Sequence, residues 1–417
     1  MLIDFSVENF RSIRAPVTLS MIQQSPRRAR QRGGNRKRPI PADEEISPSL
    51  EVPGWDFRLL RTAAIFGANA SGKSNVLAAL SFLLESLDPN SGPATWRTSA
   101  SPFLLDEESS HKPTRFRLRL ALDTGSSHVI ADYAFAIEGK SVVTEKLTVT
   151  GPGTKAPTLF FDRDVRGKKV EVNEGMPAIV EQTALVLTDE ALLLGHIVRV
   201  VRIPEFVALA KWLFNSTIDT ASGVDSLIKT RVRSRFDTAF LARAGSLLEQ
   251  LDTGVTAVLN RGDDAEKGPE FWVAHSTAGG TRTWPLREES AGTRRLFYVT
   301  GPAFDALDGP GLIGLDEFGA HLHPHMARHI VALFQRAETN PKGAQLIFNS
   351  HDVTLQADHL LRRDQIWFTS KDAIGATELV PLSDFKVRND LALERAYLDG
   401  RFGAVPILPT IGVDDGP

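Results

Sequence analysis

Hydrophobic and polar positions alternate in several segments of the first 172 residues, which is the pattern of half-buried β-strands. Residues 2–7 and 17–21 predict two strands on either side of Asn9-Phe10-Arg11-Ser12. Further segments predict an antiparallel sheet, and they span residues 116–120, 129–137, 142–149, 159–161 and 170–172.

Farther along the chain, apolar residues recur at intervals of three and four, which predicts helices between residues 190 and 259. Heptads are not sustained there, so we expect a compact helical lobe and not a coiled-coil arm. Residues 271–275 and 283–286 predict a hairpin. The pattern as a whole predicts an N-terminal lobe with the antiparallel β subdomain, a helical lobe and a C-terminal lobe, over residues 1–190, 191–260 and 261–417.

Three short apolar runs predict buried strands of an α/β protein, at residues 63–66, 312–315 and 346–348. Each run leads into a polar segment. Because ligands bind at the carboxyl ends of the strands in open α/β sheets, these polar segments are candidate site residues.

Composition narrows the function classes. The 417 residues carry a net charge of -3, which gives no overall attraction to nucleic acid or membranes. The absence of cysteine excludes disulfides and Cys-ligated zinc. No apolar run approaches the ~20 residues of a membrane span, and the N-terminus lacks the apolar core of a signal peptide, so we expect a cytoplasmic protein.

A basic segment, residues 27–38, has seven cationic residues in twelve. Such a block repels itself and predicts a surface loop. It could contact the phosphate backbone of DNA or RNA, the acidic face of a partner protein, or nothing.

Residues 67–74 read Gly-Ala-Asn-Ala-Ser-Gly-Lys-Ser between an apolar run and a helical pattern, which is the context of a phosphate-binding loop. Glycines let backbone N–H groups surround phosphate oxygens, and the following helix points its positive end at them. We expect Lys73 to reach the β- and γ-phosphates and Ser74 to bind Mg²⁺. The other predicted nucleotide-binding residues of this segment are Gly67, Asn69, Gly72 and Asn75.

Three later segments supply candidate chemistry. Ser290 and Gly292 precede a helix and fit an anion-binding helix start. Asp316, at the end of the second apolar run, is placed to hold Mg²⁺, and Glu317 to deprotonate the attacking water. His351 follows the third run and could bind the γ-phosphate or water.

Three alternating histidines, at positions 321, 323 and 325, raise the hypothesis of a zinc site. We do not favour it, because no further His or acidic ligand lies at zinc spacing.

The order of these motifs resembles the ATPase heads of ABC proteins of the SMC and DNA-repair type. The resemblance implies a P-loop NTPase of ABC-head type with a mixed central sheet, and a head-to-tail dimer that holds ATP and Mg²⁺ between its subunits. It implies that Ser290 and Gly292 contact the γ-phosphate in trans, that His351 is the switch histidine, and that the segment around His323 crosses the dimer seam. Arg11 and Ser12 match an element that reaches the nucleotide in repair-type heads. No glutamine is evident at the position of the ABC Q-loop.

Additional matches after residue 285, such as Leu322-His323-Pro324 and Gly400-Arg401-Phe402-Gly403, resemble the RloA and abortive-infection group of ATPases, relatives of the OLD-family ATPase domain. That resemblance implies an ATPase that regulates a separate effector, a nuclease or TOPRIM-like protein of the RloB type, in bacterial defence against phage. Two other hypotheses stay open: an ATP-gated clamp on DNA, and a scaffold that binds ATP with little turnover.

Overall fold

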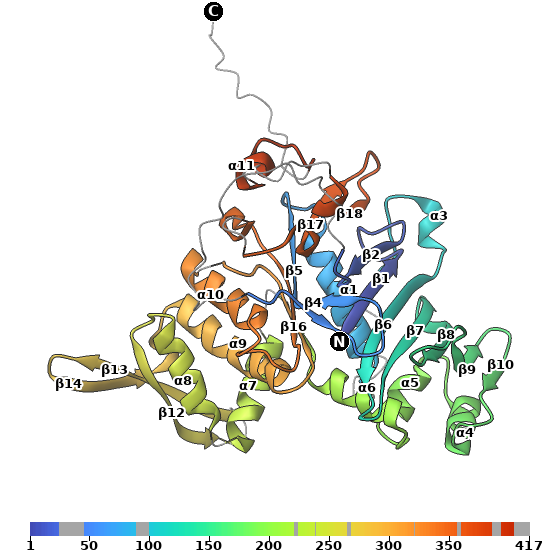
Figure 1. The fold of residues 1–417 in the computed structure, drawn as a ribbon, viewed down its shortest axis with the longest axis horizontal. Coiled ribbons are helices and arrows are strands. Elements are labelled where there is room, and N and C mark those ends of the chain that lie inside the picture. Colours follow the sequence, from blue (N-terminus) through green and yellow to red (C-terminus); the bar gives the residue numbers. More distant parts are fainter. Residues whose placement is uncertain are drawn as a thin grey trace, which may run out of the picture.

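The computed structural model describes residues 1–24, 46–88, 100–220, 224–237, 239–264, 268–320, 322–356, 360–385 and 393–403. The basic segment 27–38, His321 and residues 404–406 lie outside these ranges. The centre of the fold is a six-stranded sheet with the order β11 (Thr217–Asp219), β15 (Leu312–Leu315), β16 (Gln345–Asn349), β5 (Thr62–Gly67), β17 (Ile366–Lys371) and β18 (Thr377–Pro381) (Figure 1). Neighbouring strands are parallel except that β18 runs antiparallel to β17, so the predicted mixed sheet is confirmed.

The side chains of β5 alternate between two hydrophobic cores. Ala63 and Ile65 belong to the core shared with the N-terminal strands, and Ala64 and Phe66 belong to the core of the C-terminal half. Because both faces are buried, the strand needs apolar residues at every position. This is why the run before the phosphate loop shows no alternation.

A second, seven-stranded antiparallel sheet contains the predicted β subdomain. Its order is β10 (Lys169–Val172), β9 (Thr158–Asp164), β8 (Ser141–Thr150), β7 (His128–Glu138), β6 (Thr114–Asp123), β1 (Leu2–Glu8) and β2 (Val17–Ser20). The strands were predicted, but their union with β1 and β2 in one sheet was not. The ring of Phe82 on α1 (Lys73–Ser86) stacks on that of Phe116 on β6, with 5.1 Å between the ring centroids. This contact joins the sheet to the helix after the phosphate loop.

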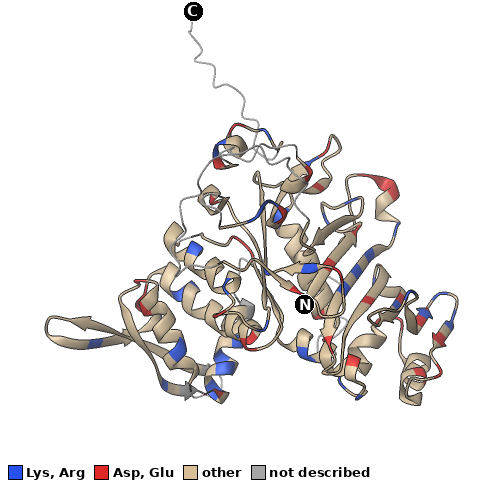
Figure 2. Ribbon diagram, viewed as in Figure 1, with Lys and Arg blue, Asp and Glu red and all other residues tan. Residues whose placement is uncertain are grey.

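Basic and acidic residues are interspersed along the strands of this sheet (Figure 2). Its arginines pair with carboxylates on adjacent strands: Arg117 bonds Asp132 on β7, and Arg119 bonds Asp4 on β1 at 2.8 Å. The positive charges of Arg117 and Arg119 on β6 are therefore neutralised by carboxylates within the sheet.

Helices occupy most of the predicted range, with three corrections: one helix lies before residue 190, and residues 217–219 and 255–259 form strands. They are α4 (Ala178–Val186), α5 (Leu193–Ile197), α6 (Pro204–Phe214), α7 (Val224–Phe236) and α8 (Phe240–Gln250). Residues 217–219, inside the range read as helical, instead form β11 at the edge of the central sheet. Three residues are too few to show a strand period against the helical pattern on both sides. The domain boundaries at 190 and 260 stay a prediction.

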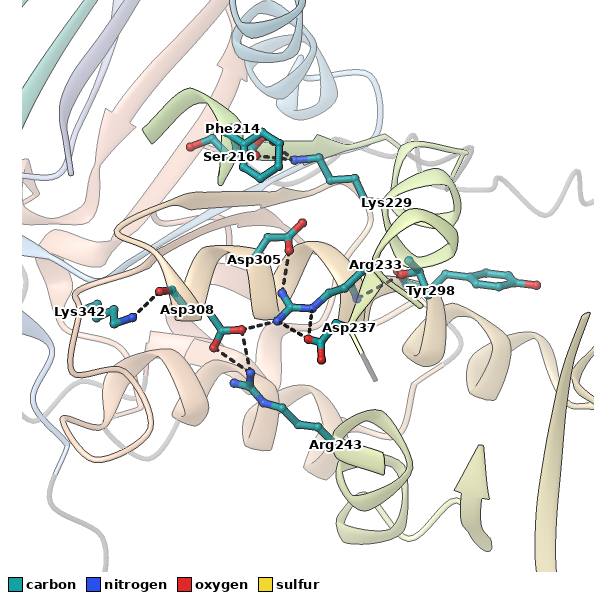
Figure 3. Close-up of polar contacts among 12 residues, drawn as sticks. Phe214, Ser216, Lys229, Arg233, Asp237, Arg243, Tyr298, Asp305, Asp308 and Lys342 are labelled. Atoms are coloured by element: carbon teal, nitrogen blue, oxygen red, sulfur yellow. Dashed lines mark hydrogen bonds and ion pairs between the residues drawn. The ribbon is translucent and has the colours of Figure 1, made fainter. Parts of the chain in front are cut away.

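Ion pairs fasten α7 and α8 to α9 (Ala291–Asp308) (Figure 3). Arg233 bonds Asp305 at 2.6 Å and also pairs with Asp308, which Arg243 of α8 contacts at 2.7 Å. Thr230 donates to the Tyr298 carbonyl at 2.6 Å. The helical segment is thus tied to the long helix that begins at the Ser290 motif.

The remaining elements lie around these two sheets and their helices. The predicted hairpin is confirmed as β13 (Gly268–Thr277) and β14 (Gly280–Pro285); with β12 (Val255–Asp264) it forms an antiparallel sheet that extends away from the centre in Figure 1. Other elements are β3 (Ser49–Glu51), β4 (Arg58–Leu60), α10 (Pro324–Gln335), α11 (Leu393–Leu398) and the single helical turn α3 (Glu107–Ser110).

Candidate functional site

The phosphate-loop segment has the predicted strand, loop and helix. Side chains of neighbouring strands lie very close to its glycines. Gly72 has a φ of 106°, and a Cβ there would lie 2.0 Å from Thr377 Oγ1. A Cβ on Gly67 would lie 2.4 Å from Thr369 Oγ1. Only glycine fits between the loop and β17–β18 at these positions.

Lys73 begins α1 and its side chain is directed back along the loop. Its ammonium donates to the carbonyls of Gly67 and Ala68, each at 2.8 Å. Burial lowers the pKa of Lys73, while Asp316 and Glu317 act in the opposite direction. The lysine and the two carboxylates are therefore close enough to interact.

Asp316 and Glu317 follow β15, and Asn349 at the end of β16 holds both. The Asn349 side-chain amide donates to Asp316 Oδ1, and its oxygen accepts the backbone N–H of Glu317 at 2.7 Å. Glu317 has a φ of 53°. Asn349 was not among the residues predicted from the sequence; the signal for it is that it ends a strand directly before Ser350 and His351.

Predicted residues from three segments line one cavity of about 680 Å³. The lining residues are Asn69, Ala70, Gly72, Lys73, Ser74, Asn75, Glu317, Asn349 and His351. Burial lowers the pKa of His351, and the charge of Lys73 lowers it further. A neutral imidazole, an ammonium and a carboxylate thus surround a space bounded by a helix N-terminus.

Ser12 lies beside the phosphate loop, and its contact with the nucleotide stays a prediction. Asn75 donates to Ser12 Oγ at 2.6 Å, and Ser12 Oγ also bonds Thr377 Oγ1 at 2.8 Å. Thr377 in turn donates to the Ser71 carbonyl at 2.9 Å. Arg11 is exposed, its guanidinium lies 5.2 Å from the Phe10 ring, and it is not among the residues that line the cavity.

Ser290 caps α9 as predicted: its hydroxyl accepts the Thr293 N–H at 3.1 Å. Neither Ser290 nor Gly292 is among the described residues that line the cavity. Glu289, the residue before the cap, is anchored on the β13–β14 hairpin, where its Oε1 contacts His275 Nε2 at 2.8 Å and Trp284 Nε1 at 2.7 Å.

One turn into α9, Arg295 pairs with Asp219 of β11 at 2.8 Å. The Asp219 carbonyl accepts the Asp316 N–H at 2.9 Å. The helix that begins at Ser290 is thus linked through two contacts to the carboxylate pair of its own chain.

The donor set fits a magnesium nucleotide. Mg²⁺ takes oxygen ligands, typically one or two carboxylates together with substrate phosphates. Ser74 supplies a hydroxyl at the start of α1, and Asp316, 8% exposed, supplies a carboxylate oriented by Asn349. Within the described ranges, no group of three or more His, Asp or Glu side chains is arranged to hold a metal ion by itself. None of the described helices combines the length and apolarity needed to cross a membrane.

A family model matches the chain. The model of the family described as "AAA domain, putative AbiEii toxin, Type IV TA system" matches residues 63–174 and 206–358. No curated protein matches the chain. The matched ranges cover more than half of the sequence and include the phosphate loop, the Ser290 helix start, the carboxylate pair and His351. The chain therefore belongs to this AbiEii-type family of AAA ATPase domains, in agreement with the abortive-infection group that its motifs resemble.

Proposed function

We propose that this protein hydrolyses ATP in a head-to-tail dimer and that the nucleotide-dependent dimer regulates a separate effector protein. The observation that carries the proposal is the convergence of Lys73, Glu317 and His351 on one cavity while Ser290 and Gly292 lie outside its lining. A second copy is the natural source of the helix start that this cavity lacks.

In this proposal each residue of the cavity has a defined task. Lys73 moves from the Gly67 and Ala68 carbonyls onto the phosphates, and the loop N–H groups bind their oxygens. Glu317 accepts a proton from the attacking water, and His351 hydrogen-bonds the γ-phosphate or that water. Bound Mg²⁺ would neutralise charge on the phosphates, with Ser74 and Asp316 as its protein ligands.

Trapping of the dimer tests this proposal. Glu317→Gln keeps the size of the side chain but cannot take the proton, so ATP should accumulate uncut and hold two chains together. We expect size-exclusion chromatography with ATP to give a stable dimer for Glu317→Gln and a monomer for Lys73→Ala. Glu249→Gln, an exposed substitution on α8, is the matched control. A Glu317→Gln chain that stays monomeric with bound ATP would contradict the dimer.

Complementation tests whether the site is shared. Ser290→Asp keeps a side chain that caps a helix, but it places a negative charge where the γ-phosphate would approach. Neither Ser290→Asp nor Lys73→Ala should hydrolyse ATP alone. Their mixture should regain turnover, because a mixed dimer pairs an intact loop with an intact helix start. Absence of recovery in a mixture shown to contain mixed dimers would rule out sharing in trans.

The regulated effector and the role in defence against phage are supported by the family match and the resemblance to the abortive-infection group. Co-expression with the product of the neighbouring gene, scored by plaque formation, tests this part. Protection that is lost in Lys73→Ala is the expected result, and protection that is unchanged would refute it.

A second candidate function, an ATP-gated clamp on DNA, is favoured by the seven cationic residues at 27–38. Duplex DNA binding that weakens with added salt and disappears when residues 27–38 are deleted would support it.

A further inference from the structure

We propose that the nucleoside of the bound nucleotide rests on an apolar shelf formed by Leu104, Leu105 and Ile374, beside β18. This inference rests on the proposed nucleotide function and adds to it the place of the base and ribose. The three side chains are unusually exposed for their type, at 69%, 69% and 47%. They come from two loops that are far apart in the sequence.

The direction of the nucleotide follows from the strand order. Glu317 and His351 lie at the ends of β15 and β16, on one side of β5. Since these residues act on the γ-phosphate, the opposite end of the nucleotide must leave the loop on the other side of β5, toward β17 and β18. From β16 to β18 is three strand spacings, about 14 Å, which a nucleoside triphosphate can span.

A chain of contacts links the shelf to the phosphate loop. Thr377 of β18 contacts the loop at the Ser71 carbonyl, and its own N–H donates to the Ser12 carbonyl at 2.7 Å. Two residues before Thr377, Gly375 lies against Leu105: a Cβ on Gly375 would be 2.9 Å from Leu105 Cδ1. The base would therefore meet apolar side chains close to the point where Asn75 bonds Ser12.

Hydrogen bonds fix both loops of the shelf in advance. Lys371 donates to the Gly375 carbonyl at 2.8 Å, and Asp372 Oδ1 accepts the backbone N–H groups of Ile374 and Ala376. On the other side, the Ser101 carbonyl accepts the Arg11 N–H at 2.7 Å. A surface that is ordered before binding loses little entropy when a flat ring covers it, and coverage removes leucine from water.

Two ligands distinguish binding at the shelf from binding at the phosphate loop. Calorimetric titration of the full-length chain with ADP and with pyrophosphate, both with Mg²⁺, measures binding with and without the nucleoside. Leu104→Ser combined with Leu105→Ser should weaken ADP binding by about tenfold and leave pyrophosphate binding unchanged. Leu185→Ser, which changes a leucine of similar exposure (71%) on α4, is the matched control and should alter neither.

Each other outcome has one meaning. Unchanged ADP affinity in the double variant would overturn the shelf and leave the phosphate loop intact. An equal loss for both ligands would also overturn it, since the substitutions would then act through the loop. If the unsubstituted protein binds neither ligand, the proposed nucleotide function itself fails.

Discussion

Asn349 accepts the backbone N–H of Glu317 at 2.7 Å, and this bond holds the residue that we assign as the general base at a φ of 53°. The same side chain donates to Asp316. One amide therefore sets the positions of both carboxylates relative to β16, the strand that leads to His351.

We expect Asn349→Ala to lower kcat for ATP by about 100-fold, because a general base displaced by about 1 Å loses much of its effect. Nucleotide affinity should change little, since the phosphate-loop contacts remain. Steady-state hydrolysis and ADP titration measure the two quantities.

The control is Asn340→Ala. Asn340 is also fully buried and bonds Phe334 and Ala344, but it is not among the residues that line the cavity. Both substitutions should lower the free energy of unfolding by about 1–3 kcal/mol through unpaired buried groups. If Asn340→Ala reduces kcat as much as Asn349→Ala at a temperature where both are folded, the effect is one of stability.

Gly72→Ala should abolish nucleotide binding. The new Cβ would overlap the Thr377 side chain, and alanine would be strained at a φ of 106°, at a cost of about 1–3 kcal/mol. Gly262→Ala in β12, where the added Cβ meets open space, should leave binding and stability close to those of the unsubstituted protein. Thermal unfolding together with ADP titration checks both, and ADP binding that survives in Gly72→Ala would show that the loop does not need this close approach.

The sequence predicted the elements that carry the site better than the contacts that complete it. The spacing of Gly67, Gly72 and Lys73 is a local pattern, and the apolar runs before Asp316 and His351 are local as well. They could be read because a buried parallel strand demands consecutive apolar residues.

Long-range contacts left no such pattern. Thr377 lies about 300 positions after Gly72 in the sequence, and its role depends on β18 packing beside the loop. Asn349 is one polar residue among several at a strand end. β11 has only three residues, so its pairing with β15 decided its structure, and its own sequence did not.

Glu289 should position the Ser290 helix start, because its carboxylate ties this turn to the hairpin. Glu289→Ala removes both contacts, to His275 and to Trp284, and we expect hydrolysis to fall at least tenfold while ADP binding is kept. Glu289→Gln retains an oxygen that can accept the Trp284 N–H and should preserve more activity. Glu288→Ala, which alters an exposed neighbour that pairs with Arg287 at 3.5 Å, is the control.

Three measurements interpret the Glu289 series. In Glu289→Ala, ATP hydrolysis and dimer formation should be reduced, while the affinity for ADP should be unchanged. A variant that hydrolyses ATP normally would show that the hairpin contact serves only the packing of β14.

The pH dependence of turnover should report on His351. Burial, and then the charge of Lys73, lowers the pKa of this imidazole from its ordinary value near 6.5. His351 is therefore neutral at pH 7, and it gains a proton only as the pH falls through the lowered pKa. The protonated ring would add a second cation beside Lys73 and compete with its bond to phosphate. We expect kcat at saturating ATP to stay level from pH 8 to pH 7 and to fall only below about pH 6.5. His351→Gln keeps a hydrogen-bonding side chain that does not titrate, so its lower kcat should lose this acidic decline. An identical decline in both proteins would assign it to another group and would contradict a direct role of His351 at the γ-phosphate.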